Sequence, residues 1–302
     1  MLCYPLGTGL AFKALSIEEH LFGSEAYLAL QGKEAFTIMP PPTFGAGRLF
    51  CFQHGKGLAT QYKSPFTQGH FEQMGHLGLA KMLTEEMVAR GAHETLLQLP
   101  PMLPGLAKWH AWPDANSAFK VVACAANYHL VISPLPFAQQ LPADQRRVLR
   151  RQFAAGWQTR LATAYELPLV YDVLASNRAS KGYPMPLTLT ELQAAFKTLP
   201  EHYRAYVVST PADLLVGAAV VVEVTGLVWY TFMLGHISAG PGASPILSLL
   251  AQIWADAQNA GVAVLDLGTA GLPGQEHMGL AAFKRSLGAV QTAKIMLRLS
   301  RN

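Results

Sequence analysis

The chain has 302 residues, of which 51% are hydrophobic and 14% charged, and its formal net charge is +4. This composition excludes a disordered chain and predicts one or two sizeable buried cores. No uninterrupted apolar run reaches the roughly 18 residues that a membrane span requires. No basic leader followed by an apolar segment is visible, so we expect a cytoplasmic protein with no membrane partner.

The cysteines and the basic residues indicate which disulfides and which nucleic-acid partners can be expected. Cys3, Cys51 and Cys124 are far apart and odd in number, which predicts reduced, buried thiols and no disulfide framework. The basic charge is too mild to indicate a DNA partner. The one dense basic run, RRVLRR at 146–151, is interpreted as a solvated helix face or as a contact to phosphates of a cofactor or RNA.

A helix, a glycine and a strand follow one another twice along the chain. A helical pattern stops at Gly91 and runs into ETLLQL, and the helix that begins at Ser244 stops at Gly261 and runs into VAVLDL. The two glycines lie 170 positions apart (261 minus 91), and each unit is later followed by another strand, at 128–133 and 294–300. This order predicts a duplicated domain, with chance similarity between two ordinary α/β units as the alternative.

Prolines and a basic, alanine-rich stretch divide the two halves. Residues 144–164 read as a helix, which predicts a linking helix within 141–168, an N-terminal unit over 1–140 and a C-terminal unit over 169–302. The C-terminal unit continues with a helix near Val170 and a capping box formed by Thr188 and Glu191.

Three strand-like runs follow that capping box. They are YRAYVVS, LLVGAAVVVEV and GLVWYTFMLG, and the last two are joined by a short hairpin signal at Thr225 and Gly226. The C-terminal half thus reads as two helices, three antiparallel strands, a loop, a helix, a strand, a helix and a strand. This order predicts an α/β protein with a mixed sheet.

Three segments of the C-terminal half carry a resemblance to a known family. They are YDVLASNRASKGYP at 171–184, SPILSLLAQIWADAQNAGVAVLDLGTA at 244–270 and GLAAFKRSLGA at 279–289. Together with the element order they resemble GNAT acyltransferases, and more closely the FemAB-like acetyltransferase family, in which two GNAT-like domains are fused. The resemblance implies two tandem GNAT-like domains, the first of them degenerate, and an acyl-CoA donor.

The fold that this resemblance implies offers the donor a groove. Two diverging central strands expose an edge that an extended donor arm can pair with, and the next helix N-terminus attracts phosphates. The residues at that position are Gly240, Gly242, Ala243 and Ser244, with Ser244 as the expected N-cap. The chain departs from the family pattern at Ile237, where Gln or Arg is called for, and Pro241 removes one donor. A plain surface loop is the alternative.

Transfer of an acyl group to an amine needs a base that deprotonates the amine and an acid that protonates the leaving group. The candidate catalytic residues are His236, Glu223, Asp266 and Tyr230. His236 is alternatively a loop histidine and Glu223 an outward-facing strand residue. Asp266 stands in an apolar strand and requires a partner. Tyr230, or else His277, would protonate the leaving group, because 272–289 lacks the tyrosine that the resemblance places there.

Substrate-binding candidates come from two of the resembling segments. They are Asn177, Arg178, Lys181, Phe283 and Lys284. We expect Arg178 or Lys181 to be the partner of Asp266, since the resemblance places both motifs along one cleft. Lys284 would bind an anionic group above Phe283, or else lie in solvent over a core aromatic ring.

Three hypotheses for the function follow. The first is an N-acyltransferase that acts on an amine of a small molecule, sugar or peptide with acyl-CoA as donor. The second changes the donor to an aminoacyl-tRNA, as in Fem-type ligases, although no heptad-bearing arm for tRNA is visible. The third is a catalytically inactive GNAT-fold protein that binds a ligand. The six histidines of the N-terminal half show no ligand-like pairing, so no metal is expected; they are His54, His70, His76, His93, His110 and His129.

Overall fold

The computed structural model describes residues 21–30, 36–39, 47–60, 69–71, 76–103, 118–238, 240 and 242–301. Within these ranges no helix is long and apolar enough to span a membrane. Cys51 is buried as expected, whereas Cys124 is exposed. Cys3 lies outside the described residues.

The helices of the described ranges are η2 (Leu21–Gly23), α1 (Glu25–Leu30), α2 (His76–Ala89), α3 (Phe137–Gln140), α4 (Ala143–Ala154), η5 (Ala164–Glu166), α5 (Leu167–Ala179), α6 (Leu189–Thr198), α7 (Pro245–Asn259) and α8 (Met278–Ser286). The strands are β1 (Phe36–Ile38), β2 (Gly47–His54), β3 (Gly57–Ala59), β4 (Gly69–Phe71), β5 (Glu94–Gln98), β6 (Lys120–Val131), β7 (Gln158–Leu161), β8 (Tyr203–Ser209), β9 (Leu215–Thr225), β10 (Val228–His236), β11 (Val264–Thr269), β12 (Gly271–Leu272), β13 (Gln275–Glu276) and β14 (Val290–Ser300).

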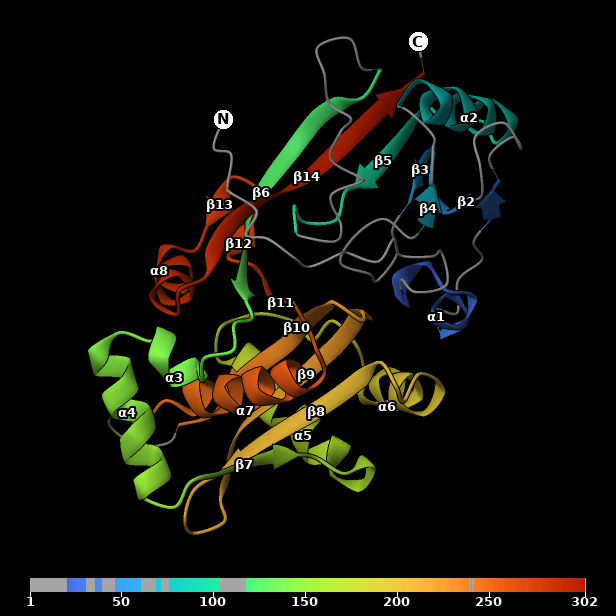
Figure 1. Cartoon of the computed structure of the whole chain (residues 1–302). Helices are drawn as coiled ribbons and strands as arrows, with labels where there is room; N and C mark the ends of the chain where they lie inside the picture. Colours follow the sequence, from blue (N-terminus) through green and yellow to red (C-terminus); the bar gives the residue numbers. More distant parts are fainter. Residues whose placement is uncertain are drawn as a thin grey trace.

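One mixed sheet runs through both halves of the chain (Figure 1). Its strand order is β1-β2-β3-β5-β14-β6-β11-β10-β9-β8-β7, with β4 paired to β2. The pairs β3–β5 and β10–β11 are parallel, and the other neighbours are antiparallel. The mixed sheet predicted from the sequence is therefore confirmed, while the division into units at 140 and 169 stays a prediction.

The middle of the sheet is made by two strands that cross between the halves. β6 comes from the N-terminal half and pairs with β11 of the C-terminal half, and β14, the last strand, pairs with β5 near the start. β6 and β14 also pair with each other and run side by side between the two halves in Figure 1. Side chains from distant parts of the sequence are thereby brought onto one face.

The predicted helix-glycine-strand repeat is present in the structure. α2 leads through Gly91 to β5, and α7 leads through Gly261 to β11. Both glycines have a left-handed backbone, with φ of 64° and 71°, which ends each helix and turns the chain toward its strand. The capping box of Thr188 and Glu191 also forms as predicted, at the start of α6.

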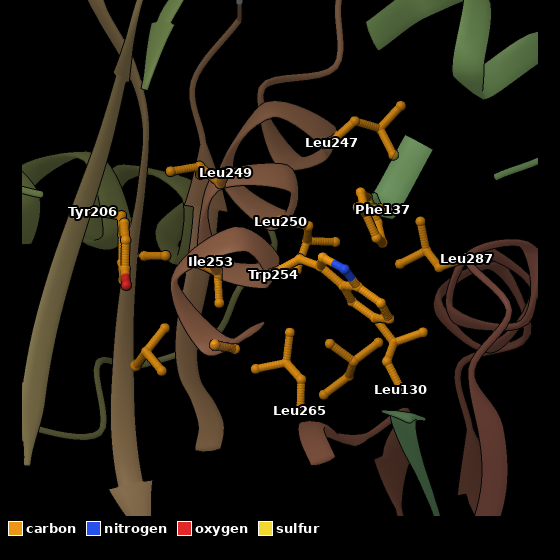
Figure 2. Packing of buried hydrophobic residues seen from close by; sticks show 14 of the residues in the cluster. Leu130, Phe137, Tyr206, Leu247, Leu249, Leu250, Ile253, Trp254, Leu265 and Leu287 are labelled. Atoms are coloured by element: carbon orange, nitrogen blue, oxygen red, sulfur yellow. The ribbon is translucent and has the colours of Figure 1, made fainter. Parts of the chain in front are cut away.

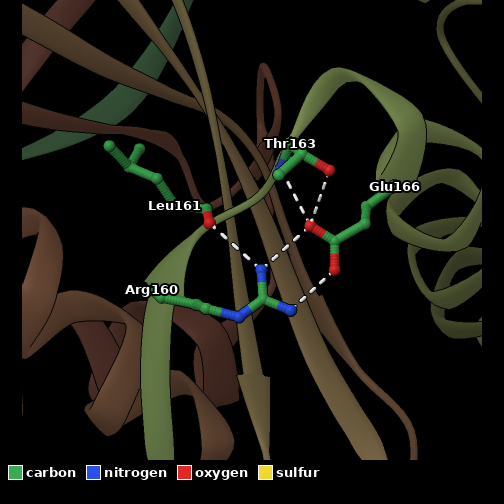
Figure 3. A network of polar contacts seen from close by, with 4 residues as sticks. All are labelled: Arg160, Leu161, Thr163 and Glu166. Atoms are coloured by element: carbon green, nitrogen blue, oxygen red, sulfur yellow. Dashed lines mark hydrogen bonds and ion pairs between the residues drawn. The ribbon is translucent and has the colours of Figure 1, made fainter.

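The linking helix is shorter than predicted. The helix expected over 144–164 ends at Ala154, because the chain turns at Gly156 with φ of 84° and residues 158–161 pair with β8 as strand β7. The corner after β7 is held by polar contacts (Figure 3). Arg160 donates to both carboxylate oxygens of Glu166, at 2.9 and 2.6 Å, and Glu166 also accepts from the backbone N–H of Thr163.

Helices cover both faces of the C-terminal part of the sheet. α5 and α6 pack on one face, and α7 packs on the other. On the α7 face Trp254 lies among Phe137, Leu130 and Leu287, and its ring centroid is 5.6 Å from that of Phe137 (Figure 2). These contacts fix α7, and hence its N-terminus, against the sheet.

Gly217 of β9 allows α7 to approach the sheet closely. A Cβ placed on Gly217 would lie 2.7 Å from Val208 Cγ1 and 3.0 Å from Pro245 Cβ. We expect Gly217→Ala to lower the free energy of unfolding by about 1–3 kcal/mol, because it overpacks this contact. Urea unfolding would measure the change. Gly226→Ala is the control, since its Cβ would meet nothing within 4 Å; an equal effect of the two substitutions would contradict the packing argument.

Candidate active site

The ladder between β10 and β11 ends partway along β10. The two strands pair only from Val228–Val264 to Tyr230–Asp266. Beyond that pair, residues 232–236 of β10 have no partner in β11. The rest of β11, at 267–269, pairs only with β6, on its other side. We call this opening the β10/β11 fork. It leaves one edge of β10 available to an extended ligand.

Irregularities in both strands produce the fork. The register of β10 shifts between Thr231 and Met233, and that of β11 shifts between Asp266 and Gly268. Thr231 Oγ1 donates to the backbone carbonyl of Asp266 at 3.1 Å and satisfies it where the ladder stops. Gly268 has φ of 72°, a conformation that favours glycine.

Asp266 lies at the base of the fork and is 4% exposed. Its Oδ1 accepts from Asn127 Nδ2 at 2.8 Å and from the Gly268 backbone N–H at 2.9 Å. Its Oδ2 accepts no hydrogen bond from the described residues. Burial raises the pKa of Asp266 above the usual value of a carboxyl, so it is a stronger base than an exposed aspartate. The partner of Asp266 is thus Asn127, and the expected bond to Arg178 or Lys181 is not formed.

Two residues near Asp266 were not singled out as site residues from the sequence. His129 of β6 stands directly across from Asp266 in the ladder, and Lys294 of β14 lies on the same face of the sheet. Burial lowers the pKa of His129 from 6.5 to about 4 and lowers that of Lys294. In the sequence, the one local indication that β6 contributes to the site is the spacing of Asn127 and His129. These residues are polar and two positions apart, and hence lie on one face of the strand.

The end of α5 packs on the open segment of β10. Asn177 donates to the backbone carbonyl of His236 at 2.7 Å and accepts from Lys181 Nζ at 3.1 Å. Arg178 donates to the carbonyl of Pro184 at 2.7 Å. Tyr230 pairs with Asp266 across the ladder at the base of the fork. Burial and the charge of Asp266 raise the pKa of Tyr230, and the charge of Arg178 on α5 partly offsets this increase. The structure therefore brings the α5 residues, His236, Tyr230 and Asp266 together.

His236 is held by backbone contacts. Its Nδ1 donates to the carbonyl of Ile237 at 3.0 Å, and its own carbonyl is bonded by Asn177. This is the arrangement expected of a loop histidine, although the other ring nitrogen forms no hydrogen bond with the described residues.

Glu223 is not brought to the fork. It pairs across the hairpin with Trp229, and its carboxylate accepts from Arg204 at 2.9 Å. The Arg204 guanidinium lies 4.3 Å from the centroid of the Trp229 ring. Adjacent strand residues point to opposite faces, so Glu223 lies on the face opposite Tyr230 and Asp266.

Lys284 of α8 is 6% exposed and has a defined set of partners. Its ammonium donates to the carbonyls of Leu267, Gly268 and Thr269, at 2.7, 2.9 and 2.9 Å. All of its protons are used to hold the end of β11, and burial lowers its pKa to about 8. Phe283 packs beside it against the α7 core. In this geometry Lys284 shapes the fork and has no proton left for a substrate.

The loop before α7 has the conformation expected of a close backbone approach. Gly240 and Gly242 have φ of 88° and 70°, and Pro245 is the first residue of α7. Ser244 is the N-cap, but its hydroxyl forms no capping bond. Arg151 of α4 donates to the carbonyl of Gly242 at 3.2 Å, so a guanidinium lies beside the helix N-terminus. Ala239 and Pro241 lie outside the described residues.

No metal-binding group is found among the described histidine, cysteine, aspartate and glutamate residues. No family model matches the chain, and no curated protein matches its sequence. Solved structures match it in fold. FemX has a TM-score of 0.69 at 12% identity, over 95% of this chain and 94% of that one.

Two further solved structures match the chain in fold. The C-terminal domain of a putative lysylphosphatidylglycerol synthetase from Agrobacterium fabrum has a TM-score of 0.61 at 13% identity, over 94% and 92% of the two chains. L-PGS from Bacillus licheniformis has a TM-score of 0.57 at 10% identity, over 89% and 85%. The predicted mixed α/β fold is confirmed, and the chain shares its overall fold with FemX and with the C-terminal domain of the putative lysylphosphatidylglycerol synthetase.

The burial of His129 makes stability depend on pH. The folded protein holds this imidazole neutral down to about pH 4, while the unfolded chain takes up a proton below about 6.5, so stability is lost as the pH falls through this window. We expect His129→Gln to remove about 3 kcal/mol of that loss. Urea unfolding at several pH values, with exposed His54→Gln as control, measures it; an unchanged pH dependence in His129→Gln would show that the imidazole is not held neutral.

Proposed function

We propose that this chain is an N-acyltransferase that moves an acyl group from acyl-CoA to an amine of a small molecule, sugar or peptide, with Asp266 as general base. The observation that carries the proposal is the β10/β11 fork, which places an open strand edge directly beside a buried carboxylate. One oxygen of that carboxylate is fixed by Asn127 and Gly268, and the other accepts no bond from the described residues.

The donor fits the two sides of the fork. Its extended arm would pair with residues 232–234 of β10, before the point where Asn177 bonds the carbonyl of His236. Its phosphates would lie at the N-terminus of α7, where Gly240 and Gly242 let the backbone approach an anion and the helix dipole is positive. Ile237 stands where the resemblance calls for Gln or Arg. The guanidinium of Arg151 supplies a cation next to Gly242 in its place.

The chemistry needs one base and one acid. The neutral amine attacks the thioester carbonyl, a C–N bond forms and the C–S bond breaks. The amine proton passes to Asp266, whose pKa burial raises. Tyr230, whose pKa is also raised and which therefore keeps its proton at neutral pH, gives that proton to the departing thiolate. Asp266 then returns its proton to the Tyr230 oxygen, its neighbour across the last pair of the ladder.

A second donor class is supported by the surface beside the fork. Arg147, Arg150 and Arg151 of α4 are exposed, and Arg151 reaches the loop before α7. An exposed arginine face can contact the phosphates of an RNA. One matched structure is, by name, a domain of a putative lysylphosphatidylglycerol synthetase. An aminoacyl-tRNA donor is therefore the alternative to acyl-CoA, with the same acceptor chemistry at Asp266.

Donor binding is tested by ligand-induced stabilisation. Acetyl-CoA, longer acyl-CoAs and bulk tRNA are added separately, and unfolding is followed by heat or urea. A donor present at about a hundred times its dissociation constant should add about 2.7 kcal/mol to the free energy of unfolding. Stabilisation by an acyl-CoA supports the first proposal, and stabilisation by tRNA alone supports the alternative. If no donor stabilises the protein, the result supports the third hypothesis, a catalytically inactive protein that binds a ligand.

Asp266→Asn separates catalysis from folding. We expect kcat/KM to fall by about 10²- to 10⁴-fold, because the general base is lost. Donor-induced stabilisation should remain. A buried carboxyl with a raised pKa favours folding at low pH and opposes it as the pH rises through that pKa, so the amide should not lower stability at neutral pH. Exposed Asp172→Asn on α5 is the matched control; full activity of Asp266→Asn would exclude Asp266 as the base.

A further inference from the structure

Three polar side chains lie on one face of the sheet beside the fork, and they are Asp266, His129 and Lys294. Asp266 and His129 are each 4% exposed, and Nδ1 of His129 has no hydrogen-bond partner among the described residues. Within the same ranges both hydrogen bonds of the Asp266 carboxylate go to Oδ1, and Lys294, which is half-buried, forms no ion pair. They come from β11, β6 and β14, which are neighbours in the sheet.

The register places these side chains on one surface. Asp266 is opposite His129, and His129 is in turn opposite Val290 of β14. Lys294 follows Val290 by four residues in an unshifted ladder, so both point to the same face. The charges of Lys294 and Asp266 influence each other's pKa, yet no ion pair joins them. The two side chains thus share a face of the sheet without forming an ion pair with each other.

Taking a charge out of water without a partner is costly, and a fold that needed only stability would pair the carboxylate with the ammonium. Lys284 shows what a structural lysine looks like in the same region, because its ammonium is bonded by three carbonyls. Lys294 has no comparable partners. The difference indicates that Lys294 and Asp266 are arranged to receive opposite charges from a ligand.

We propose that the acceptor is an α-amino acid, whose amine lies at Asp266 and whose carboxylate lies at Lys294; this assignment rests on the acyl transfer proposed above. An α-amino acid carries an ammonium and a carboxylate a few bonds apart, so one molecule can pair with the carboxylate of Asp266 and the ammonium of Lys294 at once. His129, held neutral, can donate a further hydrogen bond from Nδ1 to the ligand carboxylate. A single cation beside a neutral imidazole matches a carboxylate better than a phosphate, which favours several donors.

Binding of matched compounds to the full chain tests this assignment. Each proteinogenic amino acid is compared by calorimetry with the amine that its decarboxylation would leave, with and without coenzyme A. At least one amino acid should bind about tenfold or more tightly than its matched amine, because the amine lacks the group that contacts Lys294. Equal binding of every amino acid and its amine, or no binding of any amino acid, would overturn the assignment.

Substitutions at Lys294 provide the second arm. Lys294→Met should reduce the affinity for the amino acid to that for the matched amine and leave the amine's affinity unchanged. Lys294→Arg, which keeps the positive charge, should retain part of the preference for the amino acid. This variant still tests the inference if Lys294→Met does not fold. Exposed Lys197→Met is the control. A preference for the amino acid that persists in Lys294→Met contradicts the inference.

The donor measurements keep the two proposals distinguishable. Stabilisation by an acyl-CoA or by tRNA without discrimination between amino acids and amines would retain the acyl transfer and reject the amino-acid acceptor. Amino-acid binding that depends on Lys294 without stabilisation by any donor would retain the binding site and reject the acyl transfer.

Discussion

The site depends on the register of the ladder that β11, β6 and β14 form at the middle of the sheet. Asn127 and Asp266 are 139 positions apart in the sequence, and only the pairing of β6 with β11 brings them together. Because side chains alternate along a strand, a slip of one residue would turn Asn127 and His129 to the other face and place Leu130 across from Asp266. The buried contacts of Leu130 and Leu265 on the α7 face oppose such a slip.

The fork follows from the same pairing. β11 is held on one side by β6 along its length, whereas it pairs with β10 only up to Asp266. The backbone groups released at this point are satisfied locally, by Thr231 at the carbonyl of Asp266 and by Asn177 at the carbonyl of His236. The opening is thus built from hydrogen-bonded parts and is stable without a ligand. A carboxylate at its base stays buried while one strand edge stays accessible.

Local patterns in the sequence predicted the elements well and their long-range contacts poorly. The capping box at Thr188, the strands over 203–236 and the glycine-terminated helices depend on nearby residues, and they form as expected. His129 and Lys294 join the site through strand pairing, which no short motif encodes. Lys284 resembles an anion ligand by its position in the sequence, but the end of β11 comes close enough to take all of its protons.

Asp266 and its two lysines show why sequence alone could not separate structural from functional charges. Lys284 and Lys294 both interact with Asp266, and burial lowers the pKa of both. The first is bonded by three backbone carbonyls and holds the end of β11, whereas the second has no such bonds among the described residues. Sites that bind or convert a ligand commonly carry such local costs, since groups arranged for a ligand are not arranged for stability. In the site proposed above, the ligand would pair with Asp266 and Lys294 whichever donor the protein uses.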